Sequence, residues 1–292
     1  SCTATTRKLN SLYQPPPMSL TYHKGPLLQG NVPVSILWYG HFTPSQKSIV
    51  SDFLLSLNTP TRTSSVSERP AVSHWWGVVN AYLKKAGKAP SRVTLATQIT
   101  DENCSLGRLL KKSHLNRLAR RVNGRPGGLT LVLTAQDVAV EGFCMSCGFH
   151  GTVKSSNSRS AFVWVGNSMT QCPGQCAWPF HQPIYGPQDP PLVAPNGDVG
   201  VDGMIINIAS LLAGAVTNPF GGGYYFGSSG AQVEAGSACS GVYGKGAYPG
   251  YPGEVLVDPT TGASYNAAGV GARKYLLPAL FDSSTSQCST LV

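Results

Sequence analysis

Charged side chains are scarce in this chain of 292 residues, where Asp, Glu, Lys and Arg make up 12% of the sequence. That fraction is about half of the ~25% usual for soluble globular proteins. Together with 33 glycines and 22 prolines, the scarcity excludes a coiled coil, a bundle of long helices and a charged disordered tail. No segment approaches the ~18 consecutive apolar residues of a membrane-spanning helix. We therefore expect a soluble globular protein, rich in loops and without a membrane span.

Acidic residues are the scarcer kind of charge, with 13 Asp and Glu against 22 Lys and Arg. The basic excess lies in residues 1–139, which hold 17 of the 22 basic residues and 5 of the 13 acidic ones. This half of the chain is therefore expected to attract polyanions. The sign of the charge does not by itself choose between an acidic polysaccharide, a nucleic acid and a membrane surface.

Several catalytic motifs are missing: a Walker loop, a GxGxxG after a strand, a GxSxG elbow and an HExxH helix. Among the few acids, Asp137 and Glu141 follow a predicted strand at residues 129–134, at the edge where α/β sheets bind ligands. They are weak catalytic candidates, as is Glu234. A salt bridge or cap at a strand end is the favoured interpretation of Asp137 and Glu141.

The cysteines predict an oxidising compartment. Their number is even and they reach both ends of the chain, which is typical of a secreted protein with up to four disulfides. The chain begins with Ser1 rather than Met, as expected after removal of a signal peptide. Asn103 begins a glycosylation sequon. The predicted disulfide cysteines, whose pairing stays open, are Cys2, Cys104, Cys144, Cys147, Cys172, Cys176, Cys239 and Cys288.

Four of these cysteines also allow a zinc interpretation. A CxxC at residues 144–147 and a CxxxC at residues 172–176 lie close in sequence to His150 and His181. Such a cluster could supply four ligands for structural zinc. In an oxidising compartment the same thiols pair with one another, so disulfides are the favoured prediction and zinc is the alternative.

Predicted strands and helices alternate along the first 220 residues. Apolar, β-branched strands are expected at residues 32–39, 92–99, 129–134 and 161–165. Helices are expected at residues 43–57, 74–85, 105–122 and 202–216. This order predicts an α/β fold, a central sheet flanked by helices in one layered domain over residues 31–292. Residues 1–30 are expected to form an extended arm. The C-terminal half is expected to consist of loops held together by disulfides, with a final turn at residues 273–280.

The helix expected at residues 105–122 is amphipathic and strongly basic on its polar face. That face is a candidate site for a polyanion such as de-esterified pectin, although a merely solvated face is equally compatible with the pattern. The residues of the candidate polyanion site are Arg108, Lys111, Lys112, Arg117, Arg120 and Arg121.

Residues 196–203 carry oxygen ligands at alternate positions, as calcium loops do. In an EF-hand register from Asp198, the third position is Gly200 and the twelfth is Ala209, and neither supplies the required ligand. We therefore favour a turn in which Asp202 caps the following helix, and keep calcium as the alternative.

Aromatic residues gather in the glycine- and proline-rich stretches of the C-terminal half, among them Tyr248 and Tyr251. Exposed rings can stack on the faces of sugars, and Trp178, Tyr224 and Tyr225 are the candidates for that role. Rings under long loops more often form a small satellite core, which is the alternative.

Four blocks of the sequence resemble the plant Exordium, or phosphate-induced protein, family. They are QCPGQCAWPFHQPIYGPQ at 171–188, the long block at 190–225, GVYGKGAYPGYPG at 241–253 and ARKYLLPALF at 272–281. The resemblance runs from about Tyr22 to Val292 and implies secretion to the cell-wall space and a part in brassinosteroid-linked cell expansion. The spacing from Cys144 to Cys147 is one residue shorter than usual in the family, which leaves the pairing of these two open.

A second resemblance bears on mechanism. Residues 208–239 are similar to secreted bacterial zinc peptidases, whose helix carries His-Glu-x-x-Glu and is followed by a later Glu. On that pattern Ser210, Leu211 and Gly214 stand where the zinc ligand, the catalytic base and the second Glu would be, and Glu234 matches the later Glu. Since Leu and Gly bind no metal and activate no water, the resemblance implies a peptidase scaffold without its metal centre.

The resulting expectation is a secreted cell-wall protein of the Exordium type that mediates growth by binding a wall polysaccharide or an extracellular receptor. We expect no nucleic-acid partner and no cofactor other than the structural zinc or calcium kept as alternatives above, and we favour a non-enzymatic role while leaving enzymatic activity open. One alternative is a carbohydrate-active enzyme using Asp137, Glu141 or Glu234. The other is a metal-dependent hydrolase with ligands drawn from His150, His181, Asp198, Asp202 and Glu234.

Overall fold

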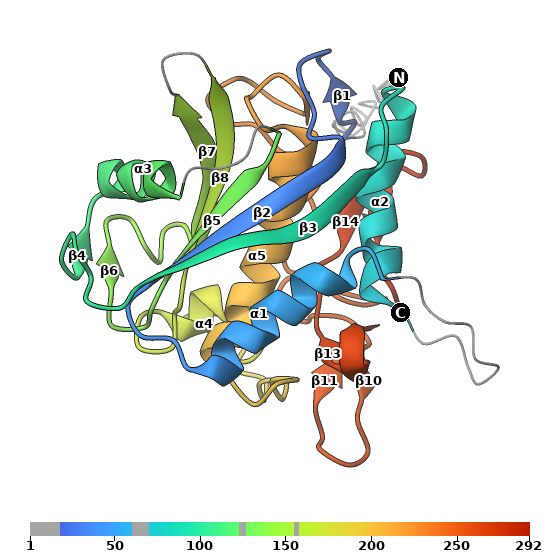
Figure 1. Ribbon diagram of the computed structural model, residues 1–292. Coiled ribbons are helices and arrows are strands. Elements are labelled where there is room, and N and C mark those ends of the chain that lie inside the picture. The colour runs from blue at the N-terminus through green and yellow to red at the C-terminus, as the bar shows by residue number, and fades with distance from the viewer. Residues whose placement is uncertain (1–17, 60–69, 123–126, 155–157) are drawn as a thin grey trace, which may run out of the picture.

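The computed structural model describes residues 18–59, 70–122, 127–154 and 158–292 (Figure 1). At its centre lies a five-stranded sheet. Its strands, in spatial order, are β3 (Ser91–Asp101), β2 (Gly30–Tyr39), β5 (Leu129–Thr134), β8 (Arg159–Gly166) and β7 (Gly148–Lys154). The first four are parallel and β7 runs antiparallel to β8 at the edge. The predicted α/β class with a central sheet is confirmed.

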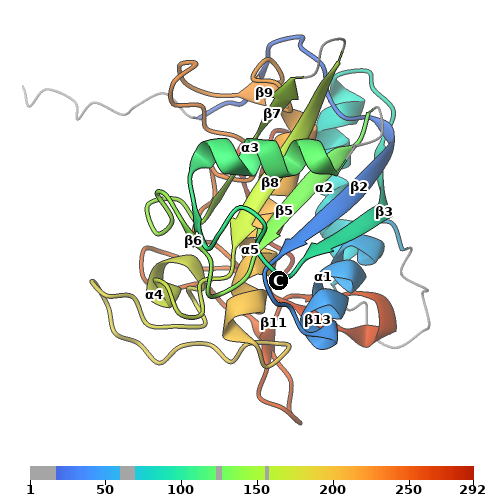
Figure 2. The ribbon, with the colours of Figure 1, turned by 60° about the vertical axis from the view of Figure 1, so that its left-hand side comes forward.

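Helices cover both faces of this sheet, which makes three layers (Figures 1 and 2). On one face lie α1 (Pro44–Ser56), α2 (Val72–Lys85) and α5 (Val199–Thr217). On the other lies α3 (Lys112–Arg121), which packs against β5 and β7. Because β2 and β5 have helices on both sides, their residues are almost all buried.

The start of α1 follows from its sequence. Thr43 accepts a hydrogen bond from the backbone N–H of Gln46, whose side chain accepts one from the Thr43 N–H, and Pro44 opens the first turn. The predicted helix at residues 43–57 is therefore confirmed. The four predicted strands are confirmed as β2, β3, β5 and β8, the strand at residues 129–134 with identical bounds.

The predicted helix at residues 105–122 is wrong in its first two turns. Gly107 has a φ of +83°, outside the helical range, and residues 109–110 form the short strand β4 (Leu109–Leu110), parallel to β6 (Ala139–Val140). Pairing with β6 satisfies backbone groups that a helix would have bonded internally. The helix therefore begins only at Lys112, and Arg108 lies outside it.

Helix α5 is the core helix of the C-terminal half. Its N-cap is Asp198, which accepts a hydrogen bond from the Val201 N–H, so the prediction that Asp202 caps this helix is wrong by one turn. By length and composition alone α5 could cross a membrane, with a mean hydropathy of 1.8. In this structure 78% of that window is buried within the protein, which is the position of a core helix.

The remainder of the C-terminal half consists of short pieces. The antiparallel pairs are β1 (Thr21–Tyr22) with β9 (Tyr224–Tyr225), β10 (Leu256–Val257) with β11 (Ser264–Tyr265), β12 (Ala267–Ala268) with β13 (Lys274–Tyr275), and β14 (Leu280–Asp282) with β15 (Gln287–Ser289). The helical pieces are α4 (Pro173–Cys176) and a 3-10 turn at Val270–Ala272. The turn predicted at residues 273–280 is instead extended, because Lys274 and Tyr275 pair with β12.

Residues 18–30 lie against the domain, where Leu20, Leu27 and Leu28 are buried. The rest of the predicted arm, residues 1–17, lies outside the described residues, as does Cys2.

Candidate functional site

Three disulfides join six of the seven described cysteines: Cys144–Cys172, Cys147–Cys176 and Cys239–Cys288. The first two tie the turn before β7 to the short helix α4. Their four sulfurs are therefore not available as thiolate ligands, and the described residues contain no group of three or more His, Cys, Asp or Glu able to hold a metal ion. Cys104 is buried and has no disulfide partner among the described residues; its assignment to a disulfide stays a prediction, since Cys2 lies outside them.

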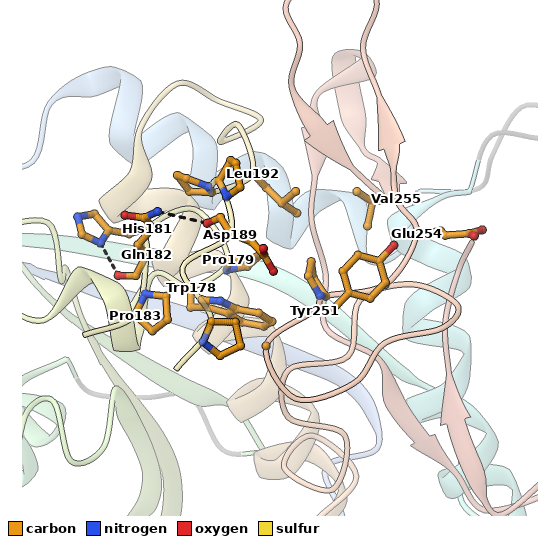
Figure 3. A pocket seen from close by; sticks show the side chains of 16 residues that line it. Trp178, Pro179, His181, Gln182, Pro183, Asp189, Leu192, Tyr251, Glu254 and Val255 are labelled. Carbon is orange, nitrogen blue, oxygen red and sulfur yellow. Dashed lines mark hydrogen bonds between the residues drawn. The ribbon is translucent and has the colours of Figure 1, made fainter. Parts of the chain in front are cut away.

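The segment that follows α4 forms one wall of a groove. Its cavity of about 540 Å³ is bounded by residues 178–192 on one side and residues 250–255 on the other (Figure 3). A second cavity of about 600 Å³ shares Trp178, Pro183, Pro187 and Gly250 with the first and continues past Tyr185 and Tyr248. We call the two together the aromatic groove. Each cavity is of the size that proteins use for small ligands.

The groove is built on a separate small core. Phe180, Tyr243 and Leu276 are buried together beneath it, and the ring of Trp178 lies 5.8 Å from that of Tyr243. The opposite wall is a tight turn in which the Tyr248 and Tyr251 backbones pair. Gly250 in that turn has a φ of +93°, and a Cβ there would lie 2.8 Å from Pro187. Only glycine fits both the turn and the close approach of the two walls.

The rings of the groove are accessible. Tyr185 and Tyr248 are 87% and 63% exposed, and Trp178 and Tyr251 are half-buried. Polar groups flank the rings: Asp189, His181, Gln182 and Glu254 line the first cavity. Figure 3 shows the Asp189 side chain on the cavity side and the Glu254 carboxylate directed away from the indole of Trp178. Aromatic faces bordered by hydrogen-bonding groups are suited to a sugar, which has an apolar ring face and a hydroxyl rim.

The three predicted sugar-stacking residues do not lie together. Trp178 lies in the groove, whereas Tyr224 and Tyr225 belong to β9 in another part of the molecule (Figure 2). Tyr224 is 2% exposed and packs between Tyr22 and Tyr82, so it is corrected to a core residue. Tyr225 is already stacked on His23, with the ring centres 3.7 Å apart.

A second cluster of polar groups surrounds Gly214 on α5. His150 Nε2 on β7 lies 2.8 Å from Glu234 Oε2, and Asn218 donates a hydrogen bond of 2.6 Å to Glu234 Oε1. A Cβ on Gly214 would lie 2.5 Å from Glu234 Oε2 and 3.3 Å from His150 Nε2, so a larger residue there would displace the pair. The structure thus unites two candidates that are 84 residues apart. Two ligands are too few for a protein zinc site.

The other candidate metal ligands are dispersed. His181 is exposed in the groove, bonded to the backbone of Gln182. Asp198 caps α5 and accepts a hydrogen bond from Gln46. Both oxygens of Asp202 accept hydrogen bonds from Asn196. The carboxylates of Asp198 and Asp202 are therefore turned toward N–H donors, as the favoured turn predicts.

Asp202 titrates abnormally. Burial raises the pKa of its carboxyl and the hydrogen bonds from Asn196 lower it, while the negative charge of Asp198 raises it again; the pKa is about 7. This residue holds the start of α5 and is not part of the groove.

The remaining candidates lie at the carboxyl edge of the sheet and on α3. Asp137 forms an ion pair with Arg108, which agrees with the salt bridge that was favoured for Asp137 over a catalytic role. Glu141 belongs to the turn after β6, and its backbone N–H donates to Leu110. Arg121 pairs with Asp101. Lys111, Lys112, Arg117 and Arg120 remain exposed. Asn103, the predicted glycosylation site, is also exposed.

Sequence reasoning missed Tyr185, Asp189 and Glu254 as groove residues. The only sign of them in the sequence is composition: residues 183–191 and residues 247–253 both contain prolines together with glycine and tyrosine. Nothing in the spacing indicates that these two segments, far apart in the chain, face each other.

Comparison with known proteins identifies relatives of this chain. The family model described as the phosphate-induced protein 1 conserved region matches residues 20–291. The chain is 56% identical over 281 residues to the Arabidopsis thaliana protein EXORDIUM, covering 94% of this chain and 89% of that protein. It is 56% identical over 297 residues to PHOSPHATE-INDUCED 1 of Nicotiana tabacum, covering 98% and 93%.

These similarities show that the chain belongs to the Exordium (phosphate-induced protein) family. A more distant relative, EXORDIUM-like 3 of Arabidopsis thaliana, is 38% identical over 92% of this chain and 82% of that protein. No solved structure matches the chain.

Proposed function

We propose that this protein is an extracellular cell-wall protein that binds a neutral wall polysaccharide in the aromatic groove and acts in brassinosteroid-linked growth. The observation that carries the proposal is the accessibility of Trp178, Tyr185, Tyr248 and Tyr251 around two adjoining cavities. Soluble proteins bury most of their large rings, and a gathered accessible set is a feature of binding sites.

The extracellular location is supported by the disulfides. Such bridges persist in oxidising compartments and are rare in the cytosol. The relatives named EXORDIUM and PHOSPHATE-INDUCED 1 are of plant origin, which makes the plant cell wall the compartment that fits. Recovery of the protein from wall extracts rather than from protoplasts tests this part. An N-glycan detected at Asn103 would further support the extracellular location.

Binding to a polymer suits the shape of the groove. The two cavities adjoin at the residues that line both of them, so the rings of Trp178, Tyr251, Tyr248 and Tyr185 surround two neighbouring hollows rather than one closed pocket. Successive sugar units can stack on successive rings, with Asp189 and Gln182 hydrogen-bonding to hydroxyls. Rigid rings lose little conformational entropy on binding.

The test is titration of β-glucan and xyloglucan oligosaccharides into the purified protein by calorimetry. Trp178→Ala and Tyr251→Ala are each expected to weaken binding about tenfold, equivalent to loss of one well-placed stacking contact. Phe226→Ala is the control, since Phe226 is 45% exposed on another part of the surface. Equal affinities in all variants would refute the groove as the site. Binding to an extracellular receptor domain but to no glycan would replace the polysaccharide by a protein partner.

A carbohydrate-active enzyme is the second candidate, favoured by Asp189 and Glu254 in one cavity. Glycosidases need two carboxyl groups flanking the scissile bond, whereas the Glu254 carboxylate is directed away from Trp178 (Figure 3). Release of reducing sugar that Asp189→Asn abolishes would establish the enzyme. If the protein binds the polymer and releases no reducing sugar during incubation, the result would support binding without catalysis.

A further inference from the structure

Helix α3 separates its residues into two sides. At 100° per residue its basic residues occupy half of the helix circumference. The exposed basic residues are Lys112, Arg117, Arg120 and Arg121. The buried side consists of Leu115, Leu118 and Ala119. Lys111 extends the exposed set by one residue before the helix.

Most of this positive charge is not neutralised within the described residues. Arg121 pairs with Asp101, whose side chain is 8% exposed and also accepts from Ser105. Burial raises the pKa of Asp101, but the hydrogen bonds from Ser105 and Arg121 outweigh it and hold the pKa below its usual range. Arg120 bonds to the neutral Asn116. Lys111 and Arg117 form no ion pair among the residues that the structure describes.

The arrangement works against the stability of the helix itself. Arg117 lies three residues from Arg120 and four from Arg121, spacings at which like charges repel on a helix surface. Lys111 and Lys112 lie at the N-terminus of α3, where the helix dipole favours anions, and its first turn holds no acidic residue. A bound polyanion would relieve both conflicts.

The face is also held rigidly. Leu115 and Leu118 are fully buried against the sheet, and Asn116 donates a hydrogen bond to the backbone of Thr152 on β7. Lys112 lies over the ring of Phe149 on the same strand. A partner therefore meets guanidinium groups on a fixed support, which reduces the entropy lost on binding.

We infer that the exposed face of α3 binds an acidic polysaccharide, a polymer of carboxylated sugars, at a site separate from the aromatic groove. Guanidinium groups form paired hydrogen bonds with carboxylates, and a chain with one carboxylate per sugar presents them in a row. The disulfides indicate a compartment without nucleic acid, and α3 contains no Phe, Tyr or Trp on which a base could stack. It also exposes no apolar side chain to enter a membrane.

This inference rests on the extracellular location proposed above and not on the groove. The test measures binding to immobilised polygalacturonate by interferometry at several salt concentrations. Wild-type protein is expected to bind with an affinity that falls as salt rises, and to bind the fully methyl-esterified polymer at least about tenfold more weakly. Neutral oligosaccharide binding is measured in parallel, because it reports on the groove alone.

The decisive variant is Arg117→Glu with Arg120→Glu. Its matched control is Lys84→Glu with Lys85→Glu, the same change of charge on α2 on the other face of the sheet (Figure 1). The α3 variant is expected to lose affinity for polygalacturonate about tenfold or more, and the control about twofold or less. Both should stay folded, as judged by circular dichroism, and keep neutral-sugar binding, and Trp178→Ala should keep polygalacturonate binding.

Three outcomes would overturn the inference. Equal loss in both charge variants would mean that net charge, and not this face, attracts the polymer. No loss in the α3 variant would place the site elsewhere. Binding to phosphatidylserine vesicles without binding to polygalacturonate would make the partner a lipid surface. A failure confined to neutral oligosaccharides would refute the groove while leaving α3 intact.

Discussion

Residues 30–166 and residues 218–292 are held in place by different kinds of contact. In the first region, the strands of the central sheet are six to eleven residues long, and β2, β5 and β8 bury nearly all of their residues between helices. In the second, no strand exceeds three residues, and the chain is fixed by a disulfide and by backbone segments in direct contact. Gly236 packs on the Ser210 carbonyl and Gly244 on that of Glu254, where a Cβ would overlap the oxygen.

The difference teaches where each region is vulnerable. The sheet loses stability when apolar volume is removed from it. The C-terminal region has less apolar volume to lose and depends on its covalent bridge and on the absence of side chains at close contacts. The following changes, in order of decreasing effect, test that distinction.

Removal of one bridge should have the largest effect. Cys239→Ser with Cys288→Ser opens a loop with a sequence separation of 49 residues, and the chain-entropy relation gives a loss of about 4 kcal/mol in the free energy of unfolding. Cys104→Ala is the control, because Cys104 forms no disulfide within the described residues and its truncation should cost about 1 kcal/mol. Urea titration of both variants measures the difference. Similar midpoints would mean that the bridge adds nothing to the loop region.

The junction between the regions should respond to pH through Asp202. Because its folded pKa of about 7 lies above the unfolded value of 3.8, its stabilising effect is complete below about pH 4 and is lost as the pH rises through about 7. Between about pH 5 and pH 8 the free energy of unfolding should fall by about 3 kcal/mol from this group.

Asp202→Asn should flatten this dependence, because the amide does not titrate. Asp198→Asn should weaken the dependence without abolishing it, because Asn remains an equally good N-cap while the charge that adds to the raised pKa of Asp202 is removed. Urea titrations at several pH values across that range provide the measurement. An equally steep loss of stability in the wild type and in the Asp202→Asn variant would assign the pH dependence to another group.

The smallest effect compares two glycines. Gly77 lies exposed inside α2, and a Cβ added to it would meet no atom within 4 Å, so Gly77→Ala should stabilise the protein by about 0.5–1 kcal/mol. Gly236→Ala, in contrast, should destabilise it, because the methyl group would meet the backbone of Ser210. Thermal melts of the two variants measure whether each substitution raises or lowers the stability of the protein. A stabilising Gly236→Ala would contradict the close-contact account of the loop region.

The same contrast explains what could be predicted from the sequence. Buried parallel strands are continuous apolar runs, so residues 129–134 could be identified without a structure. The Thr43–Pro44 cap is a local signal and was also readable. Strand β7 was missed because Gly148, His150 and Gly151 interrupt its apolar pattern, as suits an edge strand.

The error at residues 105–111 has a physical cause. Leu106, Leu109 and Leu110 continue the helical spacing of α3, yet Gly107 and the pairing with β6 override it. Tertiary pairing can therefore defeat a correct periodicity. The groove could be anticipated only in part, since Trp178 was a candidate while the facing wall at residues 250–255 depends on long-range packing.

The paired bridges at α4 also have a mechanical consequence. A chain joined at one point can swivel about it, whereas Cys144–Cys172 and Cys147–Cys176 join the same two short segments twice. A force on a polymer held near Trp178 would act on α4, which lies just before Trp178 in the chain. The two disulfides would transmit it from α4 to the turn before β7 through covalent bonds rather than through hydrogen bonds. From β7 the load would pass to β8 along their seven paired residues, so this wall of the groove is coupled to the central sheet by covalent bonds.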